Sequence, residues 1–190
     1  MRRGFSGDDQ PHAAALSGLC RCSPAGIPLL YYRGTVRNAM KRFKFSSAAY
    51  CADWFAAQMS VALTARLDDW QPDLITYMPI GFLHYRKRGY NQAELLAKLT
   101  AKPLSLPCEA TLRKRWFVGK QSAQKDYAAR QSNAKDAVLP KGGVDLTGKS
   151  VVLVDDIITT GATAAAAVKA LREMGASRVY VLAATFTPRK

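Results

Sequence analysis

Two adjacent carboxylates and a turn rich in threonine and glycine are the residues of this sequence best suited to chemistry. Asp155 and Asp156 directly follow the apolar run VVLV at 151–154, and the turn TTGAT at 159–163 comes soon after them. Two acidic side chains that follow a buried run are costly to desolvate without partners. The pair therefore predicts a ligand. The alternative interpretation is that the carboxylates merely end a strand and a threonine caps a helix.

The turn has the composition of an anion-binding loop. Gly161 allows the backbone to approach an oxyanion closely, and the hydroxyls of Thr159, Thr160 and Thr163 add donors. The helix that is expected to open after the turn adds its first amides and its dipole, which favour a phosphate. Together the features predict a sugar-phosphate site, in which the acidic pair accepts hydrogen bonds from hydroxyls and the turn binds the phosphate.

A βαβ unit is expected to position these residues. The run 151–154 is typical of a buried strand, residues 164–174 are expected to form a helix that ends at Gly175, and residues 178–184 a final strand. A strand, a helix and a strand so close together indicate a parallel sheet. Open α/β sheets bind ligands at the carboxyl ends of their strands, which is where the acidic pair lies.

The rest of the chain gives weaker signals. Upstream we expect a helix over 46–67, capped by Ser46 or Ser47, with an apolar core stripe. The members of that stripe are Tyr50, Trp54, Phe55, Met59 and Leu63. Further elements are expected as a strand over 73–79, a basic loop over 81–89, a helix from Asn91 to about Leu99, a short strand over 103–107 and a long basic connection over 111–134.

Length, composition and charge restrict the class of protein. The chain has 190 residues, 48% of them hydrophobic and 22% charged, which suits one globular domain. Its net charge of +14 attracts phosphate-bearing partners such as nucleotides, nucleic acid or anionic membranes, although a merely solubilising surface is the alternative. We expect a cytoplasmic protein, since neither a membrane span nor a signal peptide is visible. Neither GxxxxGK[ST] nor GxGxxG occurs.

The N-terminal segment is expected to be poorly ordered. Residues 1–30 are largely rich in glycine, proline, alanine and serine without periodicity, so we place the domain at 31–190. Cys20 and Cys22 are the clustered pair among four cysteines, and a second pair that would complete a tetrahedral zinc site is missing. We predict no zinc site.

The motif VVLVDDIITTGAT (151–163) resembles the site for 5-phosphoribosyl 1-pyrophosphate (PRPP) in type I phosphoribosyltransferases. Three further stretches resemble the ComF/GntX family of phosphoribosyltransferase-like proteins, and the resemblance covers residues 31–187. They are YRGTVRNAMKRFKF, MPI-x5-RKRGYNQAELLA and Gln121…Arg130-x-x-Asn133. The resemblance implies an α/β fold: a type I phosphoribosyltransferase-like parallel sheet with flanking helices and a small N-terminal hood segment. Family members usually begin with a zinc ribbon, of which Cys20 and Cys22 in the segment 1–30 would be a remnant, but their C-x-C spacing departs from its C-x-x-C.

The resemblance also implies roles for individual residues. Asp155 and Asp156 would hold the ribose 2′- and 3′-hydroxyls, and residues 159–163 would bind the 5′-phosphate. Mg²⁺ would bind through the substrate, with Asp155 and Asp156 as possible further ligands. Arg86, Lys87 and Arg88 would face the pyrophosphate, the alternative being a solvated basic loop. Gln121, Arg130 and Asn133 would lie in a mobile loop over the site, the alternative being a flexible linker. His84 is interpreted as a surface loop residue.

Several functions fit these implications. The first is a PRPP-binding protein of the ComF/GntX type, associated with DNA uptake or with DNA as a nutrient, which would transfer a phosphoribosyl group with Mg²⁺. Alternatives are a nucleobase- or nucleoside-salvage phosphoribosyltransferase, a PRPP-sensing protein, and a non-catalytic accessory protein that binds single-stranded DNA. The last would use the basic and aromatic residues of 31–45 and 111–127. In the alternative interpretation, the aromatic residues simply pack beneath the basic face. A homodimer is a further expectation.

Overall fold

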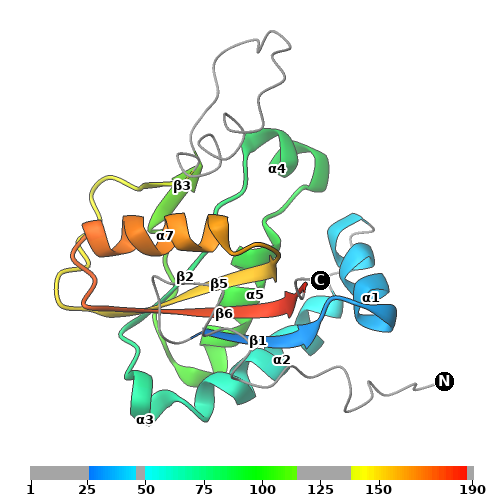
Figure 1. The fold of residues 1–190 in the computed structure, drawn as a ribbon, viewed down its shortest axis with the longest axis horizontal. Helices are drawn as coiled ribbons and strands as arrows, with labels where there is room; N and C mark the ends of the chain where they lie inside the picture. Colours follow the sequence, from blue (N-terminus) through cyan, green and yellow to red (C-terminus); the bar gives the residue numbers. More distant parts are fainter. Residues whose placement is uncertain (1–25, 46–49, 115–137, 188–190) are drawn as a thin grey trace, which may run out of the picture.

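Four parallel strands form the centre of the structure, a computed structural model that describes residues 26–45, 50–114 and 138–187. The strands follow the order β1 (Gly26–Tyr31), β6 (Arg178–Phe186), β5 (Ser150–Ile158) and β2 (Leu74–Tyr77). Each neighbouring pair is parallel, so the carboxyl ends of all four strands lie at one edge (Figure 1). This arrangement confirms the predicted α/β fold class.

Helices cover both faces of the sheet (Figure 1). Helix α7 (Ala162–Glu173) packs on one face and forms a core with Val151 and Leu153. Helices α1 (Gly34–Phe45), α2 (Tyr50–Thr64) and α5 (Gln92–Ala101) share the other core with Val152 and Val154. Successive residues of β5 therefore point to opposite cores, as the two-residue period of a strand requires.

The predicted βαβ unit is present as β5, α7 and β6. Strand β5 is longer than the predicted 151–154, so Asp155 and Asp156 lie within the strand rather than after it. The strand continues because β6 still provides a partner there: Asp155 pairs with Ala183, and Ile157 pairs with Thr185. Gly175 follows α7 with φ +95°, in the left-handed region that favours glycine, as expected for the helix end.

Two expectations between β2 and the last third of the chain were wrong. The basic loop expected over 81–89 contains a short helix, α4 (Phe82–Arg88), which ends at Gly89 with φ +79°. Its residues carry no helix breaker between the two flanking glycines, so a helix can form. The strand expected over 103–107 is replaced by a 3-10 turn, η3 (Lys102–Leu104), where Pro103 cannot donate to a strand ladder. Helix α5 begins after Asn91, as predicted.

Helix α2 ends at Thr64, before the expected end at residue 67, and its apolar stripe is only partly core. Phe55, Met59 and Leu63 are buried, but Tyr50 is 68% exposed and Trp54 is 37% exposed. The buried residues repeat every four positions, whereas the two exposed residues lie one position before that series. Residues 46–49, including the predicted caps Ser46 and Ser47, lie outside the described residues.

The remaining elements flank the sheet. A short helix, α3 (Leu67–Trp70), precedes β2. Strands β3 (Leu112–Lys114) and β4 (Val138–Pro140) form a separate antiparallel pair at the two ends of the long basic connection. Residues 26–30, expected in the N-terminal segment, form most of β1 and pair with β6. Residues 1–25 and their cysteines lie outside the described part. Within that part, no helix combines the length and apolarity needed to span a bilayer.

Candidate functional site

The acidic pair and the threonine–glycine turn line one cavity at the carboxyl edge of the sheet. Strand β2 ends at Tyr77, which pairs with Val154, so β5 continues beyond it without a neighbour on that side. A cavity of about 250 Å³ opens there. It is lined by the segments 78–81, 155–161 and 163–164 and by the side chains of His84, Arg88 and Lys114.

Each aspartate has a lysine near it. Lys44 Nζ is 2.8 Å from Asp156 Oδ2. The charge of Asp155 acts on Lys114 of β3, which lines the same cavity. Both aspartates line this cavity, so one pentose at the end of β5 could reach both carboxylates.

The electrostatics of the pair are asymmetric. Burial raises the pKa of Asp155 well above its usual range, and the neighbouring charge of Asp156 raises it further. The hydrogen bond from Asp156 N to Asp155 Oδ1, at 2.8 Å, and the charge of Lys44 act in the opposite direction. Burial also lowers the pKa of Lys114, while Asp155 opposes that shift. A ligand that donates hydrogen bonds to Asp155 would offset the cost of burying its charge.

The turn after β5 presents backbone amides to the cavity. Gly161 has φ +78° and caps α7, and the helix's own hydrogen bonds start when Ala165 N donates to Gly161 O at 2.8 Å. The amides of Thr163 and Ala164 come before that point, in the turn where a helix has no internal acceptors for them. They lie at the positive end of a twelve-residue helix. This geometry suits a phosphate.

Asn91 fixes the opposite wall. It is 6% exposed; its Oδ1 accepts from Ala93 N, and its Nδ2 donates to Met78 O, both at 3.0 Å. Met78 N in turn donates to Val154 O at 2.9 Å. One buried side chain therefore caps α5 and ties the segment 78–81 to the strand that carries the aspartates.

The structure brings only some of the predicted basic residues to the cavity. Arg88 lines it, with its Nη1 donating to Gln92 Oε1 at 2.9 Å. Arg86 and Lys87 are exposed and do not line it, and the Arg86 guanidinium lies 5.8 Å from the centre of the Phe82 ring. The helical turn explains this difference, since α4 directs neighbouring side chains to different sides. His84, interpreted as a surface loop residue, is exposed on α4 and lines the cavity.

The remaining predicted residues have mixed placements. Thr159, Thr160, Gly161 and Thr163 line the cavity. Ala162 does not line it, and its amide donates to Thr160 Oγ1 at 3.4 Å. The three residues expected in the mobile loop lie outside the described part of the chain, so their roles stay predictions. They are Gln121, Arg130 and Asn133.

Sequence reasoning missed Lys44 and Lys114. Both belong to basic stretches that were noted as a whole, 31–45 and 111–134, and neither stretch indicates which lysine turns inward. A usable signal for Lys44 was its position one residue after Phe43, which belongs to the buried stripe of α1. The identity of its partner depends on how α1 packs beside β5, and spacing along the chain does not give that.

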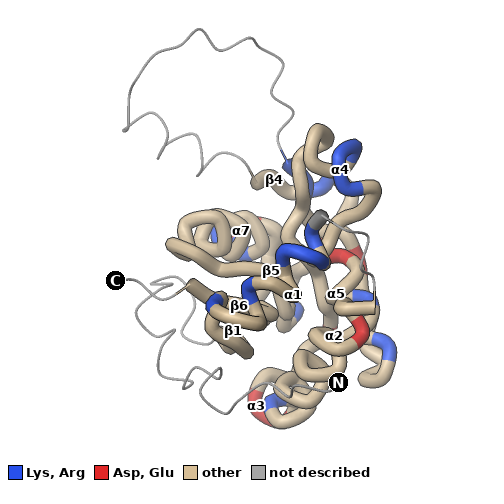
Figure 2. Tube along the Cα trace, turned by 90° about the vertical axis from the view of Figure 1, so that its right-hand side faces the viewer, with Lys and Arg blue, Asp and Glu red and all other residues tan. Residues whose placement is uncertain are grey.

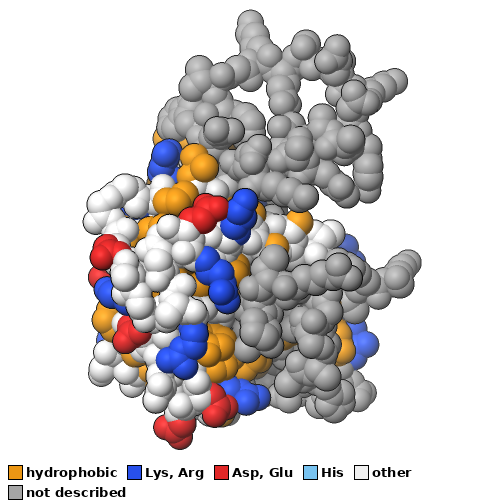
Figure 3. Space-filling model, turned by 60° about the vertical axis from the view of Figure 1, so that its left-hand side comes forward, with side chains coloured by type: hydrophobic (Ala, Val, Ile, Leu, Met, Phe, Trp, Pro, Cys, Tyr) orange, Lys and Arg blue, Asp and Glu red, His pale blue; other side chains and the backbone are white. Residues whose placement is uncertain are grey.

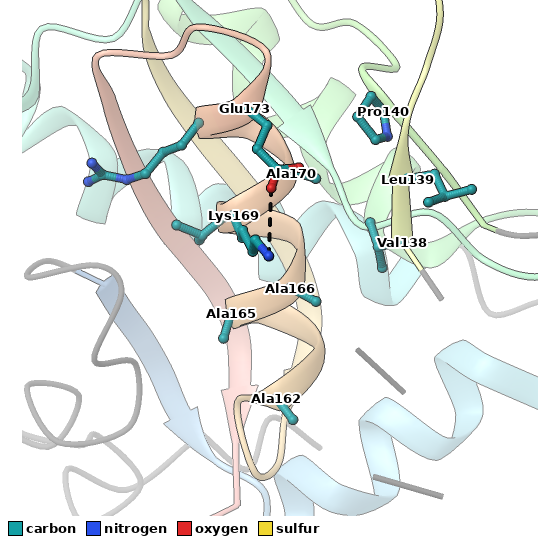
Figure 4. A pocket seen from close by; sticks show the side chains of 11 residues that line it. Val138, Leu139, Pro140, Ala162, Ala165, Ala166, Lys169, Ala170 and Glu173 are labelled. Atoms are coloured by element: carbon teal, nitrogen blue, oxygen red, sulfur yellow. Dashed lines mark ion pairs between the residues drawn. The ribbon is translucent and has the colours of Figure 1, made fainter. Parts of the chain in front are cut away.

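A larger cavity, of about 1080 Å³, lies between β4 and α7 (Figure 4). Its walls are mainly apolar, from Val138, Leu139 and Pro140 and from the alanines of α7. Its charged groups include Lys169 and Glu173, whose Nζ and Oε1 atoms are 3.7 Å apart. Neither the acidic pair nor Gly161 lines this larger cavity, so we assign the candidate functional site to the smaller cavity.

Basic residues gather at the end of the molecule that carries the site, where acidic residues also lie (Figure 2). Lysines and arginines of α1 and α4 lie around the carboxyl ends of the strands (Figure 2). The side nearer the amino ends shows acidic as well as basic residues (Figure 3). A ligand with several phosphates would therefore be attracted to the edge where the cavity opens.

The sequence of this chain is similar to those of known proteins. Competence protein F of Haemophilus influenzae is 29% identical over 150 residues, which are 75% of this chain and 64% of that protein. Competence protein ComFC of Bacillus subtilis is 27% identical over 144 residues, 76% of this chain and 56% of that protein. The chain thus spans less than two thirds of the length of these relatives.

Among solved structures, the glutamine PRPP amidotransferase from B. subtilis, in complex with ADP and GMP, is similar with a TM-score of 0.48. It is 27% identical, and the match covers 70% of this chain and 26% of that one. The phosphoribosyl transferase domain family matches residues 91–189, which hold α5, the acidic pair and the turn. The chain therefore belongs to the phosphoribosyl transferase domain family, and its sequence is similar to those of competence proteins F and ComFC.

Proposed function

We propose that the cavity binds PRPP and that the chain is a phosphoribosyltransferase-like protein of the ComF type. One observation carries this proposal: the acidic pair and the amides of the turn line the same cavity, as a phosphorylated pentose requires. The 5′-phosphate would lie on the amides and hydroxyls of 159–164. The ribose hydroxyls would donate to Asp155 and Asp156.

Basic side chains in the cavity suit the pyrophosphate end of PRPP. Arg88 and Lys114 line the cavity together with the acidic pair. Displacing pyrophosphate from the ribose develops negative charge on the leaving group and positive charge on the sugar. Fixed cations near the leaving group and carboxylates near the ring oppose those charges. These residues thus support transfer of the phosphoribosyl group to an acceptor as the reaction class.

Mg²⁺ fits the donors of the site. The oxygens of Asp155 and Asp156 are hard ligands on one cavity wall, and Mg²⁺ favours a few carboxylates together with substrate phosphates. Asp155 and Asp156 would hold it through the bound substrate. Such an ion would supply charge neutralisation at the pyrophosphate.

The relatives' names connect the proposal with DNA. Proteins 27–29% identical to this chain are named competence proteins, and we infer a role in the uptake or use of DNA. A second candidate function, binding of single-stranded DNA, is favoured by one exposed face of α1. Arg33, directly before α1, is followed at four-residue intervals by Arg37 and Lys41 on α1, and Arg33 lies 5.1 Å from the centre of the Tyr31 ring.

Thermal unfolding with PRPP and Mg²⁺ tests the proposed function. Ligand that binds only the folded protein at one hundred times its Kd stabilises it by about 2.7 kcal/mol, which raises the midpoint by several degrees. Asp155→Asn together with Asp156→Asn should abolish the rise. Lys169→Met, an exposed change on α7, should retain it. An unchanged midpoint for the wild-type protein would refute PRPP binding.

A second measurement separates the reaction classes. Release of pyrophosphate from PRPP in the presence of candidate nucleobases would identify a salvage phosphoribosyltransferase. PRPP binding without release in any acceptor mixture would favour a PRPP-sensing role.

A further inference from the structure

Lys44 connects helix α1 directly to the acidic pair. Its Nζ lies 2.8 Å from Asp156 Oδ2, and the two side chains are 18% and 14% exposed. The Lys98–Glu94 pair is equally short, at 2.7 Å, but its side chains are 59% and 31% exposed. Shielding from water strengthens the first pair relative to the second. The Lys44 contact can therefore hold a side chain in place, which an exposed pair does poorly.

The backbone that carries Lys44 is held in place. Val36, Met40 and Phe43 are fully buried on one face of α1. The hydroxyl of Tyr90 donates to the Phe43 carbonyl, and the two rings lie 5.9 Å apart. Tyr90 stands between Arg88 and Asn91, which line or brace the cavity. The last turn of α1 is thus fixed against the segment that forms one wall of the site.

The backbone of Asp156 is fixed as well. Thr185, fully buried on β6, donates through Oγ1 to Asp156 O at 2.9 Å. This bond does not fix the side-chain torsions of Asp156, and the ion pair between Lys44 Nζ and Asp156 Oδ2 restrains them. A carboxylate has about four acceptor positions, so Asp156 can still accept from a ligand while it pairs with Lys44.

We propose that Lys44 is a positioning residue for pentose recognition, which holds Asp156 so that it accepts from the 2-hydroxyl of a ribose phosphate. Lys44 is not among the residues that line the cavity, so it acts through Asp156. This inference rests on the proposed function, because it requires a phosphorylated pentose in the cavity. It predicts a preference for ribose over 2-deoxyribose phosphates that depends on Lys44.

Calorimetric titration of Lys44→Met tests the inference with three probes: ribose 5-phosphate, 2-deoxyribose 5-phosphate and inorganic phosphate. We expect the affinity for ribose 5-phosphate to fall about tenfold, the loss typical of a hydrogen bond to a charged group. The affinities for 2-deoxyribose 5-phosphate and inorganic phosphate should not change. Lys44→Arg should restore part of the loss, and Lys98→Met, which removes the exposed ion pair, should change nothing. In an Asp156→Asn background, Lys44→Met should have no further effect.

Each other outcome has a defined meaning. Wild-type protein that does not bind ribose 5-phosphate overturns the proposed function together with this inference. Wild-type binding with an unaltered ribose preference in Lys44→Met overturns the inference alone. An equal loss for all three probes would indicate a general structural role for Lys44, and it would overturn the inference too. If Lys44→Met does not fold, Lys44→Arg decides the question: a ribose preference lower than that of the wild type supports the inference, and an unchanged preference overturns it.

Discussion

At the scale of single residues, the site depends on two neighbouring aspartates in different environments. Asp156 has an ion pair with Lys44, whereas burial raises the pKa of Asp155. Lys114 lines the same cavity and interacts electrostatically with Asp155, and burial lowers its own pKa. An anionic ligand near Lys114 would compensate the cost of burying that charge.

Removal of Lys114 should therefore weaken PRPP binding. We expect Lys114→Met to lower the affinity about tenfold, since it deletes one charge-assisted contact. Lys102→Met, an exposed change on η3, is the matched control and should leave the affinity unaltered. Isothermal titration with PRPP and Mg²⁺ gives both values. Equal affinities in the two variants would mean that Lys114 does not contact the ligand.

At the scale of elements, Asn91 links helix α5 to the loop that follows β2. Asn91→Ala removes an N-cap and leaves the buried Met78 carbonyl without its donor. We expect a loss of about 2–3 kcal/mol in the free energy of unfolding. Asn91→Ser retains a capping hydroxyl and should cost less, and both variants should bind ribose 5-phosphate more weakly. Urea unfolding curves check this order; equal stability of Asn91→Ala and wild type would contradict it.

The elements also show where sequence patterns suffice. The β5–α7–β6 unit was predictable because a β-branched run, an alanine-rich stretch and Gly175 each favour one local structure. The extension of β5 through Asp155 and Asp156 could not be predicted from the sequence, because it depends on pairing with β6. Helix α4 was missed for a similar reason: a basic segment between glycines suits a loop or a short helix equally well. The acidic pair and the turn were identified from their types and spacing, but Lys44 and Lys114 come from distant segments.

At the scale of the whole molecule, charge is distributed unevenly around the site. The chain has a net charge of +14, and the exposed face of α1 adjoins the edge where the cavity opens. A polyanion bound along that face would lie next to a bound pentose phosphate. The second candidate function therefore uses the same end of the molecule as the first.

If single-stranded DNA binds there through about six phosphates, its affinity should fall roughly a thousandfold between 50 and 200 mM salt. Arg37→Glu with Lys41→Glu should weaken binding and reduce the salt dependence, whereas Lys169→Glu on α7 should have a smaller effect. Fluorescence anisotropy with a labelled oligonucleotide measures all three. Binding that does not respond to salt would argue against this surface.

A crystal structure of the protein with PRPP and Mg²⁺ would decide whether the acidic pair and the turn bind one phosphorylated pentose. We expect the 5′-phosphate within hydrogen-bonding distance of the amides of Thr163 and Ala164, with the ribose hydroxyls on Asp155 and Asp156. PRPP bound elsewhere, or bound here with its hydroxyls turned away from both carboxylates, would contradict it.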